Sequence, residues 1–225
     1  MINKILHQVW VGEYDIPERE KLLSQEIKEN HPDYEYRLWT NDNLPKIPER
    51  LQKNYNIMYE NKDYVFCADI IRWLVVYKYG GWYLDIDWKY VQNLDLLNID
   101  HRSGIVFGHW GEGWTHCDYT FANNIFGFEK KHPLVKHMID NISETNSYCP
   151  CCPGWVGIEI KKYMGLENEF SKEIWEYHKI VKENLEKINI EYGDYNQFQI
   201  YFLVHLALFA WSDENKEKFK KGLIK

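Results

Sequence analysis

The segment Gly80-Gly81-Trp82-Tyr83-Leu84-Asp85-Ile86-Asp87 decides the fold that the chain is expected to adopt. It predicts the end of a helix, a tight glycine turn, and a strand with two carboxylates two residues apart. Side chains at i and i+2 of a strand leave the same face, so Asp85 and Asp87 should point the same way, with Tyr83 beside them. The residues expected to face a core on the other side are Trp82, Leu84, Ile86 and Trp88.

The two neighbouring aspartates predict a bound cation. Two carboxylates on one face repel each other unless a cation or a hydrogen-bond donor lies between them. Oxygen-rich pairs of this kind suit Mg²⁺ or Mn²⁺, especially where substrate phosphates complete the coordination. Asp85 and Asp87 are therefore candidate metal ligands, and the segment predicts chemistry on a phosphorylated substrate.

Length and composition predict one soluble domain. The 225 residues include 17 Tyr, 10 Trp and 10 Phe, and such side chains often stack on sugars and bases. A formal net charge of -7 argues against a broad surface for nucleic acid or for an anionic membrane. The sequence shows no apolar run long enough to cross a bilayer and no signal-peptide pattern, so a cytoplasmic location is expected.

The cysteines predict free thiols. The chain has 5 cysteines, an odd number, and three of them form the cluster Cys149-Pro150-Cys151-Cys152. Structural zinc sites usually have two spaced pairs of ligands, a pattern that this cluster lacks. We therefore expect a loop with free thiols here.

Strands and helices are expected to alternate along the chain. Strands are predicted at 2–11, 34–39, 105–108 and 121–128, besides the strand with the two aspartates, and helices at 17–29, 63–79, 133–142 and 159–188. This alternation predicts an α/β sandwich with a largely parallel sheet.

Several segments, in this order, resemble glycosyltransferases with a DXD sugar-binding region. That family includes capsular-polysaccharide synthesis enzymes and yeast initiating mannosyltransferase-like proteins, and the glucosyltransferase domain of large clostridial toxins is related to it. The similar segments are 5–12 (ILHQVWVG), 32–39 (PDYEYRLW), 68–72 (ADIIR), 79–87 (YGGWYLDID) and 123–133. The resemblance covers residues 1–135 well and the remainder poorly.

The resemblance implies a GT-A fold, a nucleotide-sugar donor, Mn²⁺ or Mg²⁺, and transfer with retention of anomeric configuration. It implies one glycosyltransferase domain over 1–225, with a donor-binding core at 1–135 and a helical acceptor and lid region at 136–225. A hexose would pass to a hydroxyl of a glycan, a lipid-linked sugar or a protein, in polysaccharide or glycoconjugate synthesis.

By the same resemblance, Asp85, Asp87 and Arg72 form the catalytic centre. Asp87 would bind the metal directly, and Asp85 would contact the metal through water or the donor's ribose and sugar. Asp69 would hold sugar hydroxyls and Arg72 would contact the donor near its phosphate; the alternative for this pair is a local salt bridge on one helix face.

The remaining donor contacts are expected from the strands. Trp10 would stack on the base and Tyr83 would touch the donor, although core packing is the alternative for both. The weaker donor-binding candidates are His7, Gln8 and either Asn123 or Asn124.

His205 is a candidate third metal ligand, since imidazole suits Mn²⁺ better than Mg²⁺. Family members often end in a His-His…Ser-Trp pattern, of which this chain keeps His205 and Trp211 but has Leu206 and Ala210 at the other two positions. A buried core histidine is the alternative for His205.

Two other classes of function compete. A metal-dependent phosphohydrolase could use Asp85 as a nucleophile, but haloacid-dehalogenase-type enzymes have Thr or Val where this chain has Lys89. A non-catalytic sugar-binding module could use the aromatic residues, but it would need neither Asp69 and Arg72 nor the metal pair.

Overall fold

The computed structural model describes residues 1–97, 103–109, 120–143, 153–166, 174–194 and 203–205. The helices are α1 (Glu18–Glu29), α2 (Glu49–Glu60), α3 (Tyr64–Tyr79), α4 (Pro133–Asn141), α5 (Pro153–Met164) and α6 (Ile174–Lys187), with a short 3-10 helix at Leu94–Leu97. The strands are β1 (Ile5–Val9), β2 (Glu35–Trp39), β3 (Gly81–Leu84), β4 (Trp88–Tyr90), β5 (Gly104–His109), β6 (Thr120–Phe128), β7 (Ile190–Asp194) and β8 (Leu203–His205).

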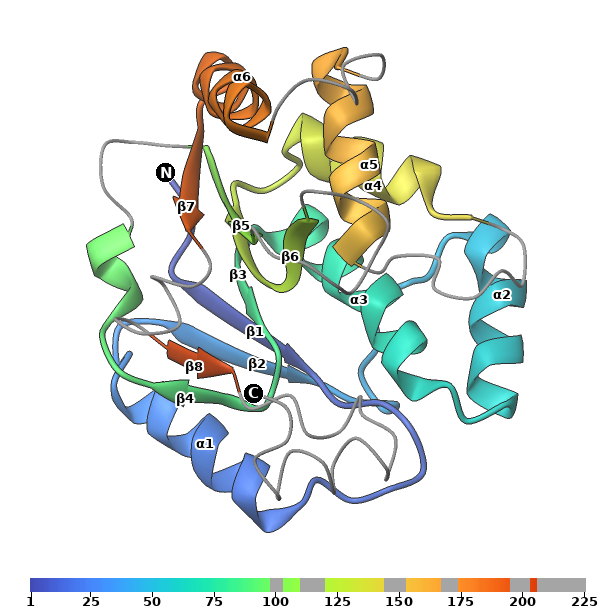
Figure 1. The fold of residues 1–225 in the computed structure, drawn as a ribbon. Coiled ribbons are helices and arrows are strands. Elements are labelled where there is room, and N and C mark those ends of the chain that lie inside the picture. The colour runs from blue at the N-terminus through green and yellow to red at the C-terminus, as the bar shows by residue number, and fades with distance from the viewer. Residues whose placement is uncertain (98–102, 110–119, 144–152, 167–173, 195–202, 206–225) are drawn as a thin grey trace, which may run out of the picture.

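Six strands form the central sheet, in the order β2-β1-β3-β6-β5-β7 (Figure 1). β1 pairs in parallel with β2 and β3, and β5 pairs in parallel with β7. β6 is antiparallel to both of its neighbours, so the other five strands share one direction. The predicted α/β architecture with a mostly parallel sheet is therefore confirmed.

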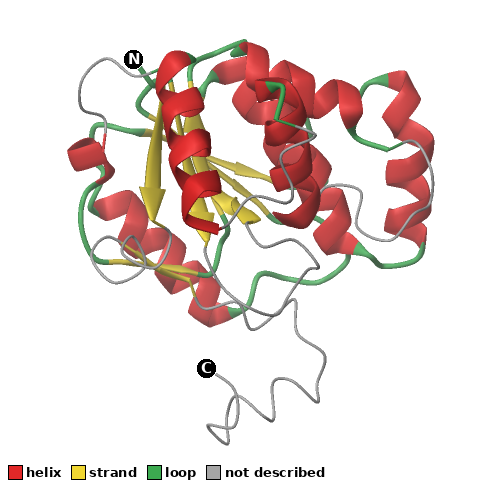
Figure 2. Ribbon diagram, turned by 45° about the horizontal axis from the view of Figure 1, so that its top comes forward, coloured by secondary structure: helices red, strands yellow, loops and turns green. Residues whose placement is uncertain are grey.

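Both faces of the sheet are buried, with helices around the strands (Figure 2). The larger core cluster packs α2 to α6 against one face and includes Trp73 and Phe126, whose rings stack at 4.2 Å. The smaller cluster covers the other face with α1 and includes Trp82 and Trp88. The predicted core residues of the aspartate segment are buried as expected, but Tyr83 is buried as well, at 1% exposure.

The aspartate segment differs from the prediction in one respect. β3 ends at Leu84, and Asp85 and Asp87 lie in the turn that leads to β4. The reason is a change of partner, because β3 pairs with β6 whereas β4 pairs with β8 in a separate two-stranded sheet. The strand alternation that would place the two carboxylates on one face therefore does not extend to them.

The part of the chain after residue 135 is not only helical. Where one helix was predicted at 159–188, the structure has two, α5, which begins earlier at Pro153, and α6, whose apolar face includes the buried Val181 and Leu185. Asn189 then adopts a left-handed backbone (φ 59°), and Ile190 begins strand β7 at the edge of the central sheet. Among the described helices, none is both long and apolar enough to span a bilayer.

Candidate functional site

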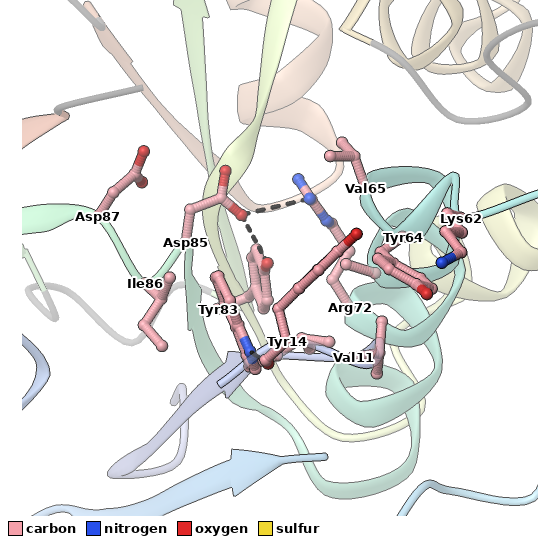
Figure 3. Close-up of a pocket in the computed structure, with 13 residues that line it drawn as sticks. Val11, Tyr14, Lys62, Tyr64, Val65, Arg72, Tyr83, Asp85, Ile86 and Asp87 are labelled. Carbon is pink, nitrogen blue, oxygen red and sulfur yellow. Dashed lines mark hydrogen bonds and ion pairs between the residues drawn. The ribbon is translucent and has the colours of Figure 1, made fainter. Parts of the chain in front are cut away.

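A pocket of about 320 Å³ opens where β1 and β3 end (Figure 3). Ligands of open α/β sheets bind at the carboxyl ends of strands, and this pocket has that position. Its wall comes from the ends of these two strands, the loop after β1, and the start of α3. The lining residues are Val9, Trp10, Val11, Tyr14, Lys62, Tyr64, Val65, Ala68, Arg72, Tyr83, Asp85, Ile86 and Asp87.

Arg72 is the centre of a charged cluster in the pocket wall. Its side chain is 4% exposed, and its Nη2 lies 2.9 Å from Asp69 Oδ1 and 3.2 Å from Asp85 Oδ1. The guanidinium carbon lies 4.7 Å from the centroid of the Tyr83 ring. A cation so held by two carboxylates and an aromatic face has a fixed orientation and stays charged in a buried place.

Asp69 and Asn123 lie next to Arg72 but do not themselves line the pocket as described. Asn123 Nδ2 donates to Asp69 Oδ1 at 3.1 Å, and Arg72 Nη1 donates to the Asn123 carbonyl oxygen. Burial raises the pKa of Asp69 to about 7, and the neighbouring Arg72 guanidinium opposes this rise. Helix α3 and strand β6 are thus joined through one polar cluster at the site.

Asp85 is held by its side chain and by its backbone. Tyr83 Oη donates to Asp85 Oδ1 at 2.6 Å, so Tyr83 does lie beside the carboxylate, although through its hydroxyl rather than through strand alternation. The Asp85 amide donates to the Asn124 carbonyl oxygen at 2.9 Å, and Gln8 Nε2 donates to the Asp85 carbonyl oxygen at 3.2 Å. The turn is therefore fixed from β6 on one side and from β1 on the other.

The two aspartates lie in a turn rather than on a strand. Figure 3 shows the Asp85 carboxylate directed at Arg72 and Tyr83, and Asp87 standing apart from it across the turn. Both residues line the pocket, so both can face one ligand. The predicted juxtaposition at one site is observed, but it occurs in a turn rather than on a strand, because β3 ends before both residues.

His7 has two partners within the fold. Trp39 Nε1 is only a donor, so His7 Nδ1 accepts its hydrogen bond at 3.0 Å and His7 Nε2 donates to the Gly80 carbonyl oxygen at 2.8 Å. Burial lowers the pKa of His7 to about 4, so the ring is neutral at pH 7. Gln8 is likewise used, since its Oε1 accepts from Tyr36 Oη at 2.6 Å. Neither residue is among those described as lining the pocket.

Trp10 lines the pocket and is half-buried. Its Nε1 donates to the Tyr14 carbonyl oxygen at 2.7 Å, which fixes the indole against the loop after β1. The neighbouring lining residues Tyr14, Lys62 and Tyr64 were not predicted from the sequence. The one local signal for them is Gly12, whose φ of 124° brings the backbone against the Tyr64 ring.

Strand pairing places the His205 backbone near the aspartate turn. β8 pairs with β4 so that His205 is opposite Trp88, the residue that follows Asp87. This register brings the His205 backbone close to the aspartate turn. The other members of the family's C-terminal pattern, including Trp211, lie outside the described residues, as does the cluster at Cys149, Cys151 and Cys152.

The donor set suits a hard divalent cation. Asp85 and Asp87 offer carboxylate oxygens, and Mg²⁺ or Mn²⁺ is often bound by one or two carboxylates with phosphate oxygens and water. Across the described segments, three or more His, Cys, Asp or Glu side chains do not gather into a complete metal site. The two carboxylates fit an ion shared with a phosphorylated ligand.

The described cysteine behaves as a core residue. Cys67 on α3 is buried with a free thiol, and burial raises its pKa to about 12. A thiol that stays protonated at pH 7 is neither a good nucleophile nor a good metal ligand.

Sequence comparisons agree with the geometry. Residues 17–103 match the family described as "Glycosyltransferase sugar-binding region containing DXD motif". The chain is 31% identical over 142 residues to inositol phosphoceramide mannosyltransferase 3 of Schizosaccharomyces pombe, covering 63% of this chain and 37% of the relative. It is 37% identical over 149 residues to mannosyl phosphorylinositol ceramide synthase SUR1 of Saccharomyces cerevisiae, covering 66% of this chain and 36% of the relative.

A solved structure extends the similarity to the fold. PaToxG glycosyltransferase superposes with a TM-score of 0.59 at 16% identity, covering 83% of this chain and 78% of that one. The predicted GT-A-type fold is thereby confirmed, whereas the chain spans well under half the length of the two yeast relatives. Residues 17–103 match a glycosyltransferase sugar-binding region with a DXD motif, and the resemblance to that family predicted from the sequence is confirmed.

Proposed function

We propose that the chain is a metal-dependent, retaining glycosyltransferase that moves a hexose from a nucleoside diphosphate sugar to a hydroxyl acceptor. The observation on which this rests is the Arg72 guanidinium, held between Asp69 and Asp85 in the wall of a pocket that Asp87 also lines. A fixed planar cation beside carboxylates that suit a divalent ion is an arrangement for binding a diphosphate.

Each side chain of the site would have its own role in binding the donor. Arg72 would bind an oxygen of the departing diphosphate, and Asp69 and Tyr83 would keep the guanidinium oriented toward it. Asp85 and Asp87 would hold the metal ion, whose chemistry is to neutralise charge that grows on the leaving group. Burial excludes water from the inner wall, which strengthens each of these charge interactions.

The acceptor would be a hydroxyl of a glycan, a lipid-linked sugar or a protein, in polysaccharide or glycoconjugate synthesis. The two yeast relatives are named for mannose transfer to inositol phosphoceramide, which makes mannose the first sugar to test. Same-face attack, in which the leaving phosphate helps to deprotonate the acceptor, would give retention. The anomeric configuration of the first product, read by proton NMR, tests that part separately.

The main experiment is a donor screen with the purified chain. Nucleotide sugars are incubated with Mn²⁺, Mg²⁺ or EDTA, and the released nucleoside diphosphate is measured. We expect hydrolysis of one donor that EDTA abolishes, and a loss of at least about a hundred-fold in Asp87→Asn. Asp33→Asn is the control, because Asp33 is an exposed aspartate outside the pocket.

Three results would contradict the proposal. Undiminished metal-dependent hydrolysis by Asp87→Asn would show that the turn with the two aspartates does not take part in the reaction. Phosphate release without any sugar donor would indicate a phosphohydrolase. Sugar binding that EDTA leaves unchanged, with no turnover, would indicate a binding module.

A further inference from the structure

Lys62 occupies the end of the pocket away from the aspartate turn. It lines the pocket, and among the described lining residues it is the one cation besides Arg72. Figure 3 shows Lys62 and Asp87 at opposite sides of the site, with Arg72 between them. The pocket therefore has two charged ends of different composition: carboxylates and a guanidinium at one, and a single ammonium at the other.

The surroundings of Lys62 are aromatic. The Tyr14 and Tyr64 rings meet edge to face with centroids 6.0 Å apart, and Trp10 is tied to the Tyr14 carbonyl oxygen. Tyr64 packs directly on Gly12, where an added Cβ would lie 2.6 Å from the ring. Rings fixed in this way present flat apolar surfaces, which suit a planar heterocycle better than they suit a diphosphate.

The Lys62 ammonium is held but can be released at little cost. Its Nζ lies 3.1 Å from Glu13 Oε2, and both side chains are 57% exposed. Exposed ion pairs contribute little to stability, because water and salt screen them. A ligand atom that accepts a hydrogen bond can therefore replace or share the Glu13 contact.

We infer that Lys62 is a specificity-determining residue that donates a hydrogen bond to O6 of guanine or O4 of uracil in the donor's nucleobase. The inference rests on the proposed function, since the diphosphate at Arg72 and Asp87 is what directs the base toward Lys62 and the aromatic rings. An ammonium is only a donor. It suits O6 of guanine or O4 of uracil, and it faces another donor in the amino groups of adenine and cytosine. At the edge that faces Lys62, the site therefore selects the keto group of guanine or uracil over the amino group of adenine or cytosine. These two pairs are called keto and amino nucleotides below.

The backbone at Lys62 offers a clean substitution. Lys62 follows the end of α2 with a left-handed φ of 64°, and its amide donates to the Tyr59 carbonyl oxygen at 3.0 Å. Glycine adopts this conformation without steric cost, so Lys62→Gly should not destabilise the fold. Lys131 is a matched control, because it has a φ of 61°, donates its amide to the Tyr77 carbonyl oxygen at 2.8 Å, and is exposed outside the pocket lining.

The test is binding of GDP, UDP, ADP and CDP by calorimetry, in Mn²⁺, to the wild-type chain and to Lys62→Gly, Lys62→Met and Lys131→Gly. The wild type should bind at least one of the two keto nucleotides about ten-fold more tightly than either amino nucleotide. Both Lys62 variants should lose about ten-fold on that nucleotide and almost all of the preference, whereas Lys131→Gly should bind like the wild type.

The two proposals fail in different ways. If the wild type binds none of the four diphosphates, the proposed function is overturned and this inference falls with it. If the wild type binds a keto nucleotide and the Lys62 variants keep its preference, only the role of Lys62 is overturned. Equal losses in Lys62→Gly and Lys131→Gly would also overturn it, because the effect would then come from the left-handed backbone.

Discussion

Two buried polar clusters flank the end of β1, and they differ in what they face. In one, Arg72 is bound by Asp69 and Asp85. In the other, His7 is bound by Trp39 Nε1 and by the Gly80 carbonyl oxygen. Both clusters join segments that are far apart in the sequence. The Arg72 cluster includes opposite charges and reaches the pocket, whereas His7 is neutral at pH 7 and is closed off by its two partners.

The difference shows that burial and hydrogen bonding do not by themselves identify a functional residue. The His7 cluster has every donor and acceptor of the imidazole used inside the fold, which is what a structural role requires. The Arg72 cluster places a guanidinium and carboxylates at a cavity, where a charged ligand can be bound. Predictions that separate stability from turnover can test this contrast.

The largest effect is expected from Arg72→Met. Loss of the guanidinium leaves the buried Asp69 without its cation, which should lower the free energy of unfolding by roughly 3–5 kcal/mol. Donor turnover should fall about a thousand-fold. Urea denaturation and the donor-hydrolysis assay measure the two effects.

Arg72→Lys separates charge from geometry. The ammonium should restore much of the stability but not the turnover, since one nitrogen cannot replace both Nη2, which contacts Asp69 and Asp85, and Nη1, which donates to the Asn123 carbonyl oxygen. Turnover near the wild-type value in Arg72→Lys would show that a positive charge alone is enough, and the pocket cluster would then resemble an ordinary ion pair.

The fold was predictable because its patterns are local. The apolar spacing of α3 and the glycines before β3 can be recognised within a few residues, and both elements form where they were predicted. The end of β3 was not predictable from the local sequence. β3 pairs with β6, whereas β4, the next strand, pairs with β8, which lies more than 70 residues after β6 in the chain.

Site residues that belong to a sequence motif could be predicted. Site residues that come together only through the tertiary fold could not. Asp69, Arg72 and Asp85 belong to one motif and meet as expected. Lys62 reaches the pocket because the turn between α2 and α3 lies beside the end of β1, a tertiary contact without a local pattern. His7 was a weaker candidate for donor binding, and its two partners within the fold favour a structural role.

A smaller effect, on pH dependence, is expected from His7→Gln. Burial lowers the pKa of His7 from its ordinary 6.5 to about 4, so between these values the unfolded chain binds a proton that the folded chain does not. The free energy of unfolding should therefore fall as the pH drops from 6.5 toward 4, by at most roughly 3 kcal/mol from this residue. Above pH 6.5 this contribution is constant.

The measurement compares urea denaturation of the wild type and His7→Gln from pH 4.5 to 7.5. His31 and His132 are also buried with lowered pKa values, so the wild-type slope includes their effect and only the difference between the two proteins reports on His7. The variant should be less stable at pH 7.5 and show a shallower slope below pH 6.5, with donor turnover little changed. If the stability of the two proteins changed with pH in parallel, His7 would not have the lowered pKa. A large rise in KM for the donor in His7→Gln would show that His7 contributes to the site.

The smallest effect is expected from Tyr83→Phe. The change removes the hydroxyl that donates to Asp85 Oδ1 but keeps the ring against the Arg72 guanidinium. The free energy of unfolding should fall by about 1 kcal/mol, and turnover should fall about ten-fold because the Asp85 carboxylate loses the hydroxyl that helps to hold it beside Arg72.

Tyr34→Phe is the matched control for Tyr83→Phe. Tyr34 Oη donates to Asp95 Oδ1 at 2.8 Å, in a cluster with Lys4 that lies outside the pocket. Both variants lose a hydroxyl bound to a carboxylate, so their losses of stability should be similar, whereas only Tyr83→Phe should lose turnover. Equal turnover in the two variants would mean that Arg72 and the backbone of the turn position Asp85 without the Tyr83 hydroxyl. The hydroxyl would then have a structural role, as His7 does.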